Sequence, residues 1–165
     1  MTHRFSPLQI LLHWSVAVLV LSQFLTDDAM GAAWRALRRG TGTPDGPLVL
    51  AHVAGGILIL ALAVWRLVLR VNRGVPPAVL AEPRPLRLAA AATHHLLYLL
   101  LLVLPVTGLA AWFGGLRPAA DLHETLTTLL LAMVALHVAG AAYQQFVLRS
   151  DVLARMLPRR TRREG

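Results

Sequence analysis

Four long apolar runs constrain this chain more than any other feature of its sequence. They cover residues 8–25, 48–69, 88–113 and 122–148. Each is close to or above the roughly 20 residues that a helix needs to cross the apolar core of a bilayer. Backbone polar groups in lipid are satisfied only in helices and closed barrels, and the runs lack the alternation that a barrel requires. We therefore predict an all-α integral membrane protein, a single membrane domain over residues 1–165 that forms a bundle of four transmembrane helices.

The composition favours the same class. Hydrophobic residues make up 56% of the 165 residues and charged residues 15%, whereas soluble domains carry about 25% charged residues. The sequence contains no cysteine, which excludes iron–sulfur clusters, thioether-attached haem and disulfides. The first run is not expected to be a cleaved signal peptide, because it is longer than a typical h-region and contains His13.

The charges beside the runs predict the orientation in the membrane. If both termini lie on one side, that side receives 12 of the 16 basic residues. The other side receives Arg35, Arg38, Arg39 and Arg117. The positive-inside rule then places the N- and C-termini in the cytoplasm. The net charge of +8 and the tail MLPRRTRREG are interpreted as topology determinants, and no nucleic-acid partner is expected.

The three connections predict which helices are neighbours. Residues 26–47 are rich in Gly, Pro and Asp and are expected to form an outer loop, with a short amphipathic turn at AAWRALRR. The second connection, VNRGVPPAVLAEPRPLR, is punctuated by proline and expected in the cytoplasm. The third, GGLRPAAD, is very short, which makes the third and fourth helices antiparallel neighbours.

Histidines inside the runs indicate a functional site, because ionisable groups within a membrane are costly unless they are satisfied. The order of the crossings places His52 and His123 near the outer surface, and His13 and His137 near the cytoplasmic surface. His137 follows His123 by 14 residues, which is about 21 Å of helix rise on nearly the same face. A haem with two imidazole ligands needs one ring on each side of a flat macrocycle. The sequence therefore predicts two haems, one at each pair.

The motif HVAG occurs at residues 52–55 and again at residues 137–140. In both copies a glycine follows the histidine by three residues and lies on the same helix face. Gly55 and Gly140 are therefore predicted to form shelves on which a porphyrin lies close to the helix, and Gly56 would widen the first shelf. Arg66 follows His52 by 14 residues, so it is predicted at the depth of the inner pair, as a counter-ion for haem propionates. Arg70 lies one turn nearer to water.

Simpler interpretations exist for each of these residues. A histidine in a membrane helix often bonds to a neighbouring helix, and glycines often permit close helix packing. Arg66 and Arg70 could extend to the headgroups. His94 and His95 begin the third run near the depth of the inner pair, and either could replace one of its ligands. We assign the ligand to His13, and expect His94 and His95 to support the site, bind propionates or face a quinone.

Four segments together resemble the bacterial cytochrome b561 family. They are SPLQILLHWSVAVLVL, HVAGGILILALAVWRLVLR, HHLLYLLLLVLPVTGL and HETLTTLLLAMVALHVAGAAYQQFVLRSDVLARMLPR. The resemblance covers nearly the whole chain in order, and HET…LH with a terminal RMLPR is its most specific part. It implies an inner-membrane four-helix bundle with two haem b groups and electron exchange with the ubiquinone pool. The axial histidines of the family carry over onto His13, His52, His123 and His137.

The sequence departs from this family in two places. Relatives often have histidines where this chain has Gln144 and Gln145, which bears on a cytoplasmic quinone contact. The connection GGLRPAAD is also shorter than in relatives, which would reduce a periplasmic substrate surface.

The function predicted from these observations is transmembrane electron transfer, with membrane lipid and quinone as partners. Some members of the family oxidise superoxide at the periplasmic side. In this chain Arg35, Arg38, Arg39 and Arg117 would form a cationic rim that attracts such an anionic one-electron donor. Iron with six ligands has no open position, so oxygen chemistry at the metal is not expected. One alternative is an anchor subunit that passes electrons for a soluble dehydrogenase or hydrogenase. Another is a histidine-lined metal transporter, which would need acidic residues near the midplane.

Overall fold

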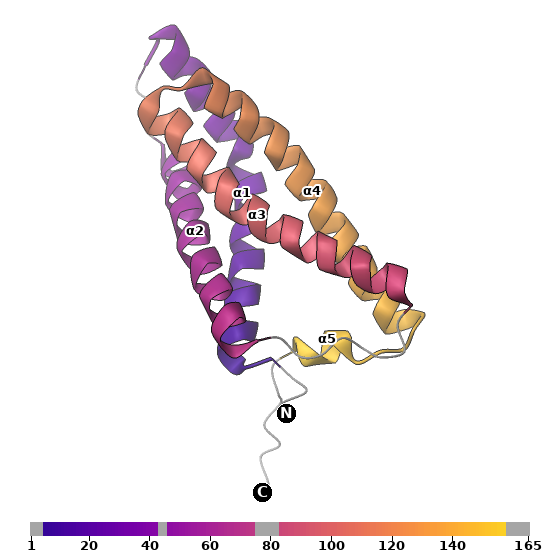
Figure 1. The fold of residues 1–165 in the computed structure, drawn as a ribbon. Coiled ribbons are helices and arrows are strands. Elements are labelled where there is room, and N and C mark those ends of the chain that lie inside the picture. Colours follow the sequence, from indigo (N-terminus) through magenta and orange to yellow (C-terminus); the bar gives the residue numbers. More distant parts are fainter. Residues whose placement is uncertain (1–4, 43–45, 75–82, 158–165) are drawn as a thin grey trace, which may run out of the picture.

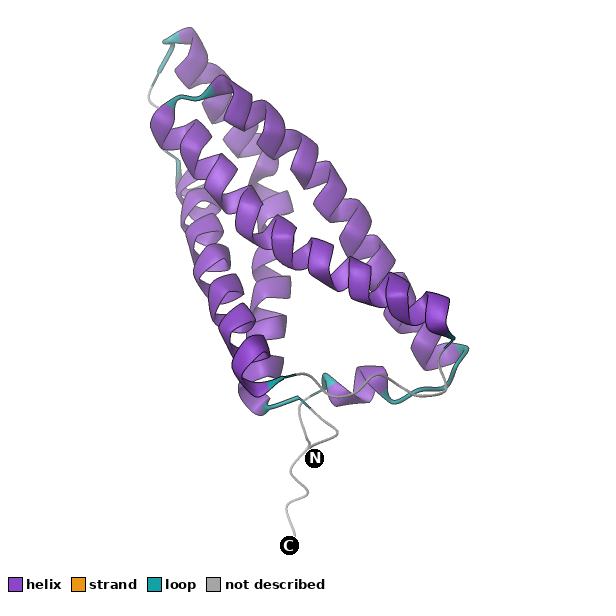
Figure 2. Cartoon of the chain, viewed as in Figure 1, coloured by secondary structure: helices purple, strands orange, loops and turns teal. Residues whose placement is uncertain are grey.

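The computed structural model describes residues 5–42, 46–74 and 83–157. This part of the chain forms five helices and no strand (Figures 1 and 2). They are α1 (Pro7–Arg39), α2 (Pro47–Arg73), α3 (Arg84–Gly114), α4 (Arg117–Phe146) and α5 (Val152–Arg155). The first four are long and apolar enough to cross a membrane, which confirms the predicted four-helix membrane bundle. Arg4, residues 75–82 of the second connection and the arginines from Arg159 onward lie outside the described residues.

The bundle consists of two helical hairpins that pack against each other. Helix α1 packs on α2, α3 packs on α4, and α2 joins the hairpins through α3 (Figure 1). Only Gly115 and Leu116 separate α3 from α4, and Gly115 has a φ of 63°, which favours glycine. The predicted antiparallel contact of these two helices is confirmed. We call the end at which α1 begins and α4 ends the terminal end, and the opposite end the loop end.

The first helix is longer than the sequence analysis predicted. Residues 26–39, expected as part of a loop, continue α1 to a total of 33 residues, about 50 Å of rise. This segment contains alanine, leucine and arginine, which favour helices, and no proline. The helix ends where Gly40 adopts a φ of 65° and its backbone N–H caps the last turn. Because the apolar core of a bilayer is about 30 Å thick, α1 extends beyond it.

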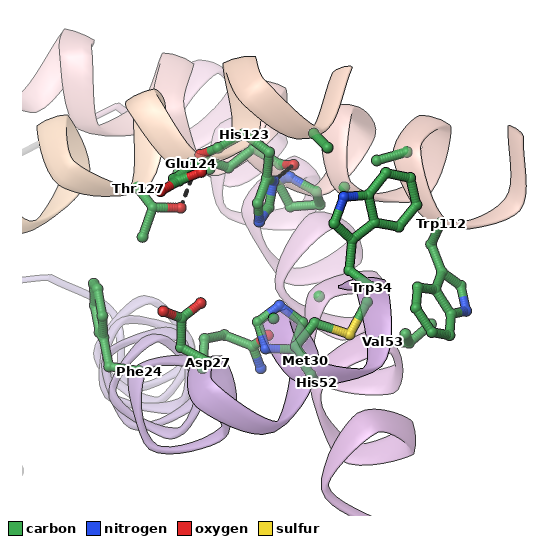
Figure 3. Close-up of a pocket in the computed structure, with 18 of the residues that line it drawn as sticks. Phe24, Asp27, Met30, Trp34, His52, Val53, Trp112, His123, Glu124 and Thr127 are labelled. Atoms are coloured by element: carbon green, nitrogen blue, oxygen red, sulfur yellow. Dashed lines mark hydrogen bonds between the residues drawn. The ribbon is translucent and has the colours of Figure 1, made fainter. Parts of the chain in front are cut away.

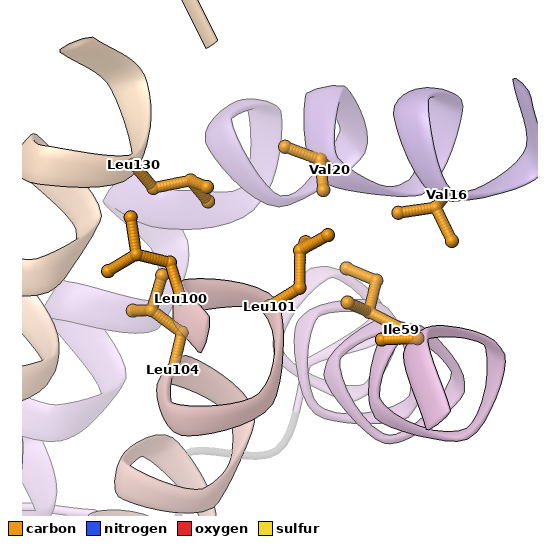
Figure 4. Packing of buried hydrophobic residues seen from close by; sticks show 8 residues of the cluster. Val16, Val20, Ile59, Leu100, Leu101, Leu104 and Leu130 are labelled. Atoms are coloured by element: carbon orange, nitrogen blue, oxygen red, sulfur yellow. The ribbon is translucent and has the colours of Figure 1, made fainter. Parts of the chain in front are cut away.

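The buried core lies in the middle of the bundle, while most apolar side chains face outward. The core cluster draws on all four long helices and comprises Val16, Val20, Ile59, Ala63, Leu100, Leu101, Leu104 and Leu130 (Figure 4). Outward-facing residues such as Leu25, Val71 and Phe146 are more than 70% exposed, as expected for a surface covered by lipid. In α2 the core residues lie between His52 and Arg66, and in α4 the core residue Leu130 lies between His123 and His137. The core therefore separates two sites.

Candidate functional site

At the loop end, His52 of α2 and His123 of α4 face each other across a cavity (Figure 3). We call them the loop-end pair. Their ring centroids are 6.4 Å apart, with an angle of 67° between the ring planes. Two imidazoles that share one metal at about 2 Å from each nitrogen have centroids roughly 6 Å apart. The cavity has a volume of about 640 Å³, within the range of ligand pockets. The pair and its cavity therefore fit a metal bound within a larger organic group.

Hydrogen bonds at the loop end fix the tautomers of both rings. His123 Nδ1 donates to the carbonyl oxygen of Leu104 at 2.9 Å, and Thr107 Oγ1 lies 3.3 Å from the same nitrogen. His52 Nδ1 lies 3.0 Å from Oγ1 of Thr26, a buried residue. The Thr26 hydroxyl donates to backbone carbonyls of its own helix, so it accepts the proton of His52 Nδ1. With both protons on Nδ1, each Nε2 keeps a lone pair for a metal, and such second bonds are typical of metal-ligating histidines.

Glycines determine how closely the loop-end rings approach the neighbouring helices. A Cβ atom at Gly108 of α3 would lie 3.0 Å from Cε1 of His123 and 3.1 Å from its Nδ1. Gly55 is buried, and a Cβ there would clash with the side chain of Gln23 on α1. Gly56 lines the cavity. On α2, Gly56 is thus the glycine that leaves space beside the cavity. Gly55 instead allows the Gln23 side chain of α1 to pack closely against α2.

At the terminal end, His13 of α1 and His137 of α4 form the second pair, which we call the terminal-end pair. Their ring centroids are 6.2 Å apart, with an angle of 69° between the planes. His94 of α3 lies nearer to His137, at 5.1 Å, and its Nδ1 bonds to the Ala90 carbonyl of its own helix. Two imidazoles that bind one metal from opposite sides, as a flat macrocycle requires, have centroids roughly 6 Å apart. The geometry therefore favours His13 over His94 as the partner of His137.

Arg66 reaches the terminal-end pair from α2. Its Nη2 donates to Nδ1 of His13 at 3.2 Å, and its guanidinium lies 5.6 Å from the ring centroid of Tyr98 on α3. Arg70 lies at the same distance from this ring, within the range of a cation–π contact. The spacing of 14 residues from His52 predicted Arg66 at this depth, whereas Tyr98 was not predicted. Two guanidinium groups on one tyrosine provide a place for anionic groups at this end of the bundle.

The two pairs differ in the state of their rings. A guanidinium can only donate, so His13 Nδ1 accepts, and the proton of a neutral His13 is then on Nε2. Binding of a metal at Nε2 therefore requires that this proton leaves Nε2. The terminal-end pair fits a shared metal by spacing, and the loop-end pair fits it by spacing and by tautomer.

Two other residues from the sequence analysis lie apart from these contacts. His95 is exposed, and its Nδ1 bonds to the Ala91 carbonyl of its own helix. Gly140 is exposed, and a Cβ there would meet no atom within 4 Å. The protein surface at Gly140 is therefore open, and its role as a shelf stays a prediction.

The charges around the loop-end cavity are opposite to those expected. Four carboxylates line the cavity, those of Asp27, Asp28, Asp121 and Glu124, and the Asp27 side chain is seen near His52 in Figure 3. Of the arginines of the predicted cationic rim, Arg35 lines the cavity and Arg38, Arg39 and Arg117 do not. The lining of the cavity is thus mainly acidic, and a rim of these four arginines around its mouth stays a prediction. The continuation of α1 as a helix carries Asp27 and Asp28 to the cavity and Arg38 and Arg39 beyond it.

A four-helix membrane bundle with facing histidine rings at the spacing of a shared metal is the architecture of a membrane-embedded cytochrome. The family model described as prokaryotic cytochrome b561 matches residues 4–159. The chain belongs to this family. It is therefore a multi-pass protein of a bacterial membrane that binds haem b and transfers electrons.

Individual relatives agree with this assignment. The chain is 34% identical to cytochrome b562 of Cereibacter sphaeroides, over 93% of this chain and 94% of the relative. It is 31% identical to a protein of Yersinia pestis named "Probable superoxide oxidase CybB", over 97% of this chain and 99% of the relative. Cytochrome b561 homolog 1 of Escherichia coli is 26% identical, over 96% of this chain and 99% of the relative.

Four residues of the site were missed by the sequence analysis, namely Thr26, Tyr98, Thr107 and Gly108. Three of them are polar residues within an apolar stretch or at its end, positions that call for a satisfied hydrogen bond. The fourth, Gly108, is a glycine within an apolar stretch, which permits close helix packing. That signal was available for the two threonines. The helix that each of them faces became clear only from the packing.

Proposed function

We propose that the protein holds two haem b groups, one between His52 and His123 and one between His13 and His137. The observation that carries this proposal is the pairing of histidine rings from different helices, at 6.4 and 6.2 Å, on either side of one apolar core. Bound haem supplies reversible one-electron chemistry. The four histidines would hold the two haems, and haem held by two histidines would supply electron transfer without substrate binding at the metal.

The two sites are placed for transfer across the membrane. His123 and His137 are 14 residues apart on one helix, about 21 Å of rise. Between them the packed leucines and valines of the core exclude water and hold the four helices in register. The distribution of arginines supports a cytoplasmic location for the terminal end and a periplasmic one for the loop end.

We propose ubiquinone as the partner at the terminal end, where His94 and His95 of α3 are exposed. Reduction of one quinone to a quinol consumes two electrons and two protons. Imidazoles can supply protons near neutral pH, and Gln144 of α4 is a further candidate for contact with the quinone. The Arg66 and Arg70 guanidinium groups are proposed to bind haem propionates at the same end.

The proposed donor at the loop end is superoxide, or another one-electron donor outside the cytoplasm. Each superoxide would give up one electron and leave as dioxygen, so two are consumed for each quinol. The Yersinia relative named as a probable superoxide oxidase supports this donor. The acidic lining of the cavity works against an anion, so we expect superoxide to react at the cavity mouth without electrostatic attraction.

A direct assay tests this function. The purified protein in detergent would be mixed with a superoxide source and a short-chain ubiquinone, and the haem spectrum and quinol formation would be followed together. We expect haem reduction followed by quinol formation, both abolished by superoxide dismutase. Haem that is reduced only after a second, co-purifying polypeptide is added would instead support the anchor-subunit alternative.

Variants of the two rival histidines test the terminal-end pair. We expect His13→Ala to lose one haem per chain, because it removes a ligand. We expect His94→Ala to keep both haems, since His94 is too near His137 to share a metal with it. The opposite result would exchange the roles of the two histidines.

A further inference from the structure

The acidic and basic side chains of this protein are separated along the bundle, and the separation coincides with the two histidine pairs. The described residues contain five carboxylates, and four of them line the loop-end cavity. The fifth, Asp151, lies near α5 and forms an ion pair with Arg155 at 2.8 Å. The terminal-end pair instead has Arg66 in direct contact and Arg70 one turn away across Tyr98. The two sites therefore experience fields of opposite sign.

The hydrogen bonds to the rings act in the same direction as the charges. At the loop end, His52 and His123 donate to neutral oxygens of Thr26 and Leu104. Such acceptors increase the electron density of the imidazole and favour the more positive, oxidised metal. At the terminal end His13 faces a cation and has no such acceptor at Nδ1. A nearby positive charge favours the reduced metal, since reduction adds one negative charge to the site.

We propose that these residues set the reduction potential at the terminal-end pair above that at the loop-end pair. Electrons delivered at the loop end are then drawn to the terminal end, and the chain favours transfer in that direction. This inference rests on the proposed function, because it requires a haem at each pair. It adds the order of the two potentials. It also assigns Arg66 and Arg70 as the residues that raise one potential, and Asp27 and Glu124 as residues that lower the other.

Arg66 keeps this role whether it bonds to His13 or to a propionate. In either position its charge stays at the terminal end, where the described carboxylate Asp151 is already paired with Arg155. Propionates at the loop end would instead meet four carboxylates and Arg35. The order of the two potentials follows from the whole set of charges and from both sets of hydrogen bonds.

A potentiometric titration of the haem spectrum in detergent tests the proposal. We expect two one-electron waves in the unsubstituted protein. In His123→Ala the remaining wave is expected to be the one of higher potential, which assigns it to the terminal-end pair. If the remaining wave is the lower one, or the two waves coincide, the proposed order is wrong. A protein with fewer than two haems per chain would instead contradict the proposed function.

Charge variants separate electrostatic tuning from structural damage. Arg66→Gln is expected to lower the higher potential by at least about 59 mV. For one electron this corresponds to a tenfold change in the equilibrium constant of reduction. Arg66→Lys, which keeps the charge, is expected to retain most of the potential. If Arg66→Gln loses haem, Arg70→Gln gives a smaller shift in the same direction, because Arg70 does not touch His13.

Asp27→Asn should raise only the lower potential. Unchanged potentials in Arg70→Gln and Asp27→Asn would overturn the assignment.

Discussion

The partners of the histidine Nδ1 atoms separate the two sites at the scale of single residues. His123 has two oxygens beside Nδ1, those of Leu104 and Thr107. His52 has the Thr26 hydroxyl at 3.0 Å and a further hydrogen bond to the backbone of Gln23. Thr26 is also buried. Because the Thr26 hydroxyl is also nearer to its ring than the Thr107 hydroxyl, at 3.0 Å against 3.3 Å, its loss is expected to matter more.

Replacing Thr26 by valine, which has nearly the same shape, tests this difference. Without this nearest side-chain acceptor the His52 ring is held less firmly, so we expect the loop-end haem to dissociate about 10- to 100-fold more readily. The measurement is the haem-to-chain ratio during transfer of haem to an excess of an acceptor protein. Thr107→Val is the matched control and should retain its haem, because Leu104 still accepts from His123. Equal losses in the two variants would contradict the assigned hydrogen bonds.

The sequence was sufficient to predict the histidine pairs but not their surroundings. A spacing of 14 residues returns to the same helix face and fixes the relative depth, so the pairs could be predicted from one helix at a time. The contact of Thr26 with His52 depends on how α1 and α2 are rotated against each other, which the spacing does not define. The spacing also does not decide between Gly55 and Gly56 as the glycine beside the cavity. Residues three and four positions after a histidine lie about equally close to it on the helix surface.

At the scale of whole elements, the contact of α3 with α4 brings His123 to its place. The two helices approach closely where Gly108 faces the His123 ring, and the short connection at Gly115 and Leu116 keeps them in register. The sequence predicted this antiparallel pair because a connection that short permits no other arrangement. It did not predict the length of α1. Residues 26–39 contain Asp and Gly, which are typical of loops, but the helix-forming residues in the same segment outweigh them.

We expect Gly108→Ala to disturb the loop-end site while the bundle stays folded. The added methyl group would lie about 3 Å from the His123 ring, so the ring must move away from Leu104 or α3 must shift from α4. The haem-to-chain ratio should fall toward one, with the helical circular dichroism unchanged. Gly42→Ala is the control, because its Cβ would meet no atom within 4 Å. Retention of two haems in Gly108→Ala would show that the ring does not need this close contact.

At the scale of the whole molecule, the loop end is acidic around its cavity and the terminal end is basic. The sequence predicted the basic end from the number of arginines, but it also assigned arginines to the donor site, because it treated residues 26–47 as one loop. Once α1 is helical to Arg39, its acidic residues face the cavity. An anionic donor is therefore repelled at the loop end.

The dependence on salt measures this repulsion. We expect the rate of haem reduction by superoxide to rise between low ionic strength and about 0.15 M, where screening acts over about 8 Å. The variant Asp27→Asn with Glu124→Gln should react faster at low salt and respond less to added salt. A rate that falls as salt is added would show attraction, and would restore the cationic rim of Arg35, Arg38, Arg39 and Arg117.

The central claim of this account is that two histidine pairs hold two haems on either side of one apolar core. The most direct measurement is the haem-to-chain ratio of the purified protein, with its dithionite-reduced minus oxidised spectrum. The account predicts two low-spin b haems per chain. One haem would contradict the assignment of one pair, most directly the terminal-end pair, where Arg66 occupies Nδ1 of His13 and His94 lies beside His137. A protein without haem would contradict both pairs.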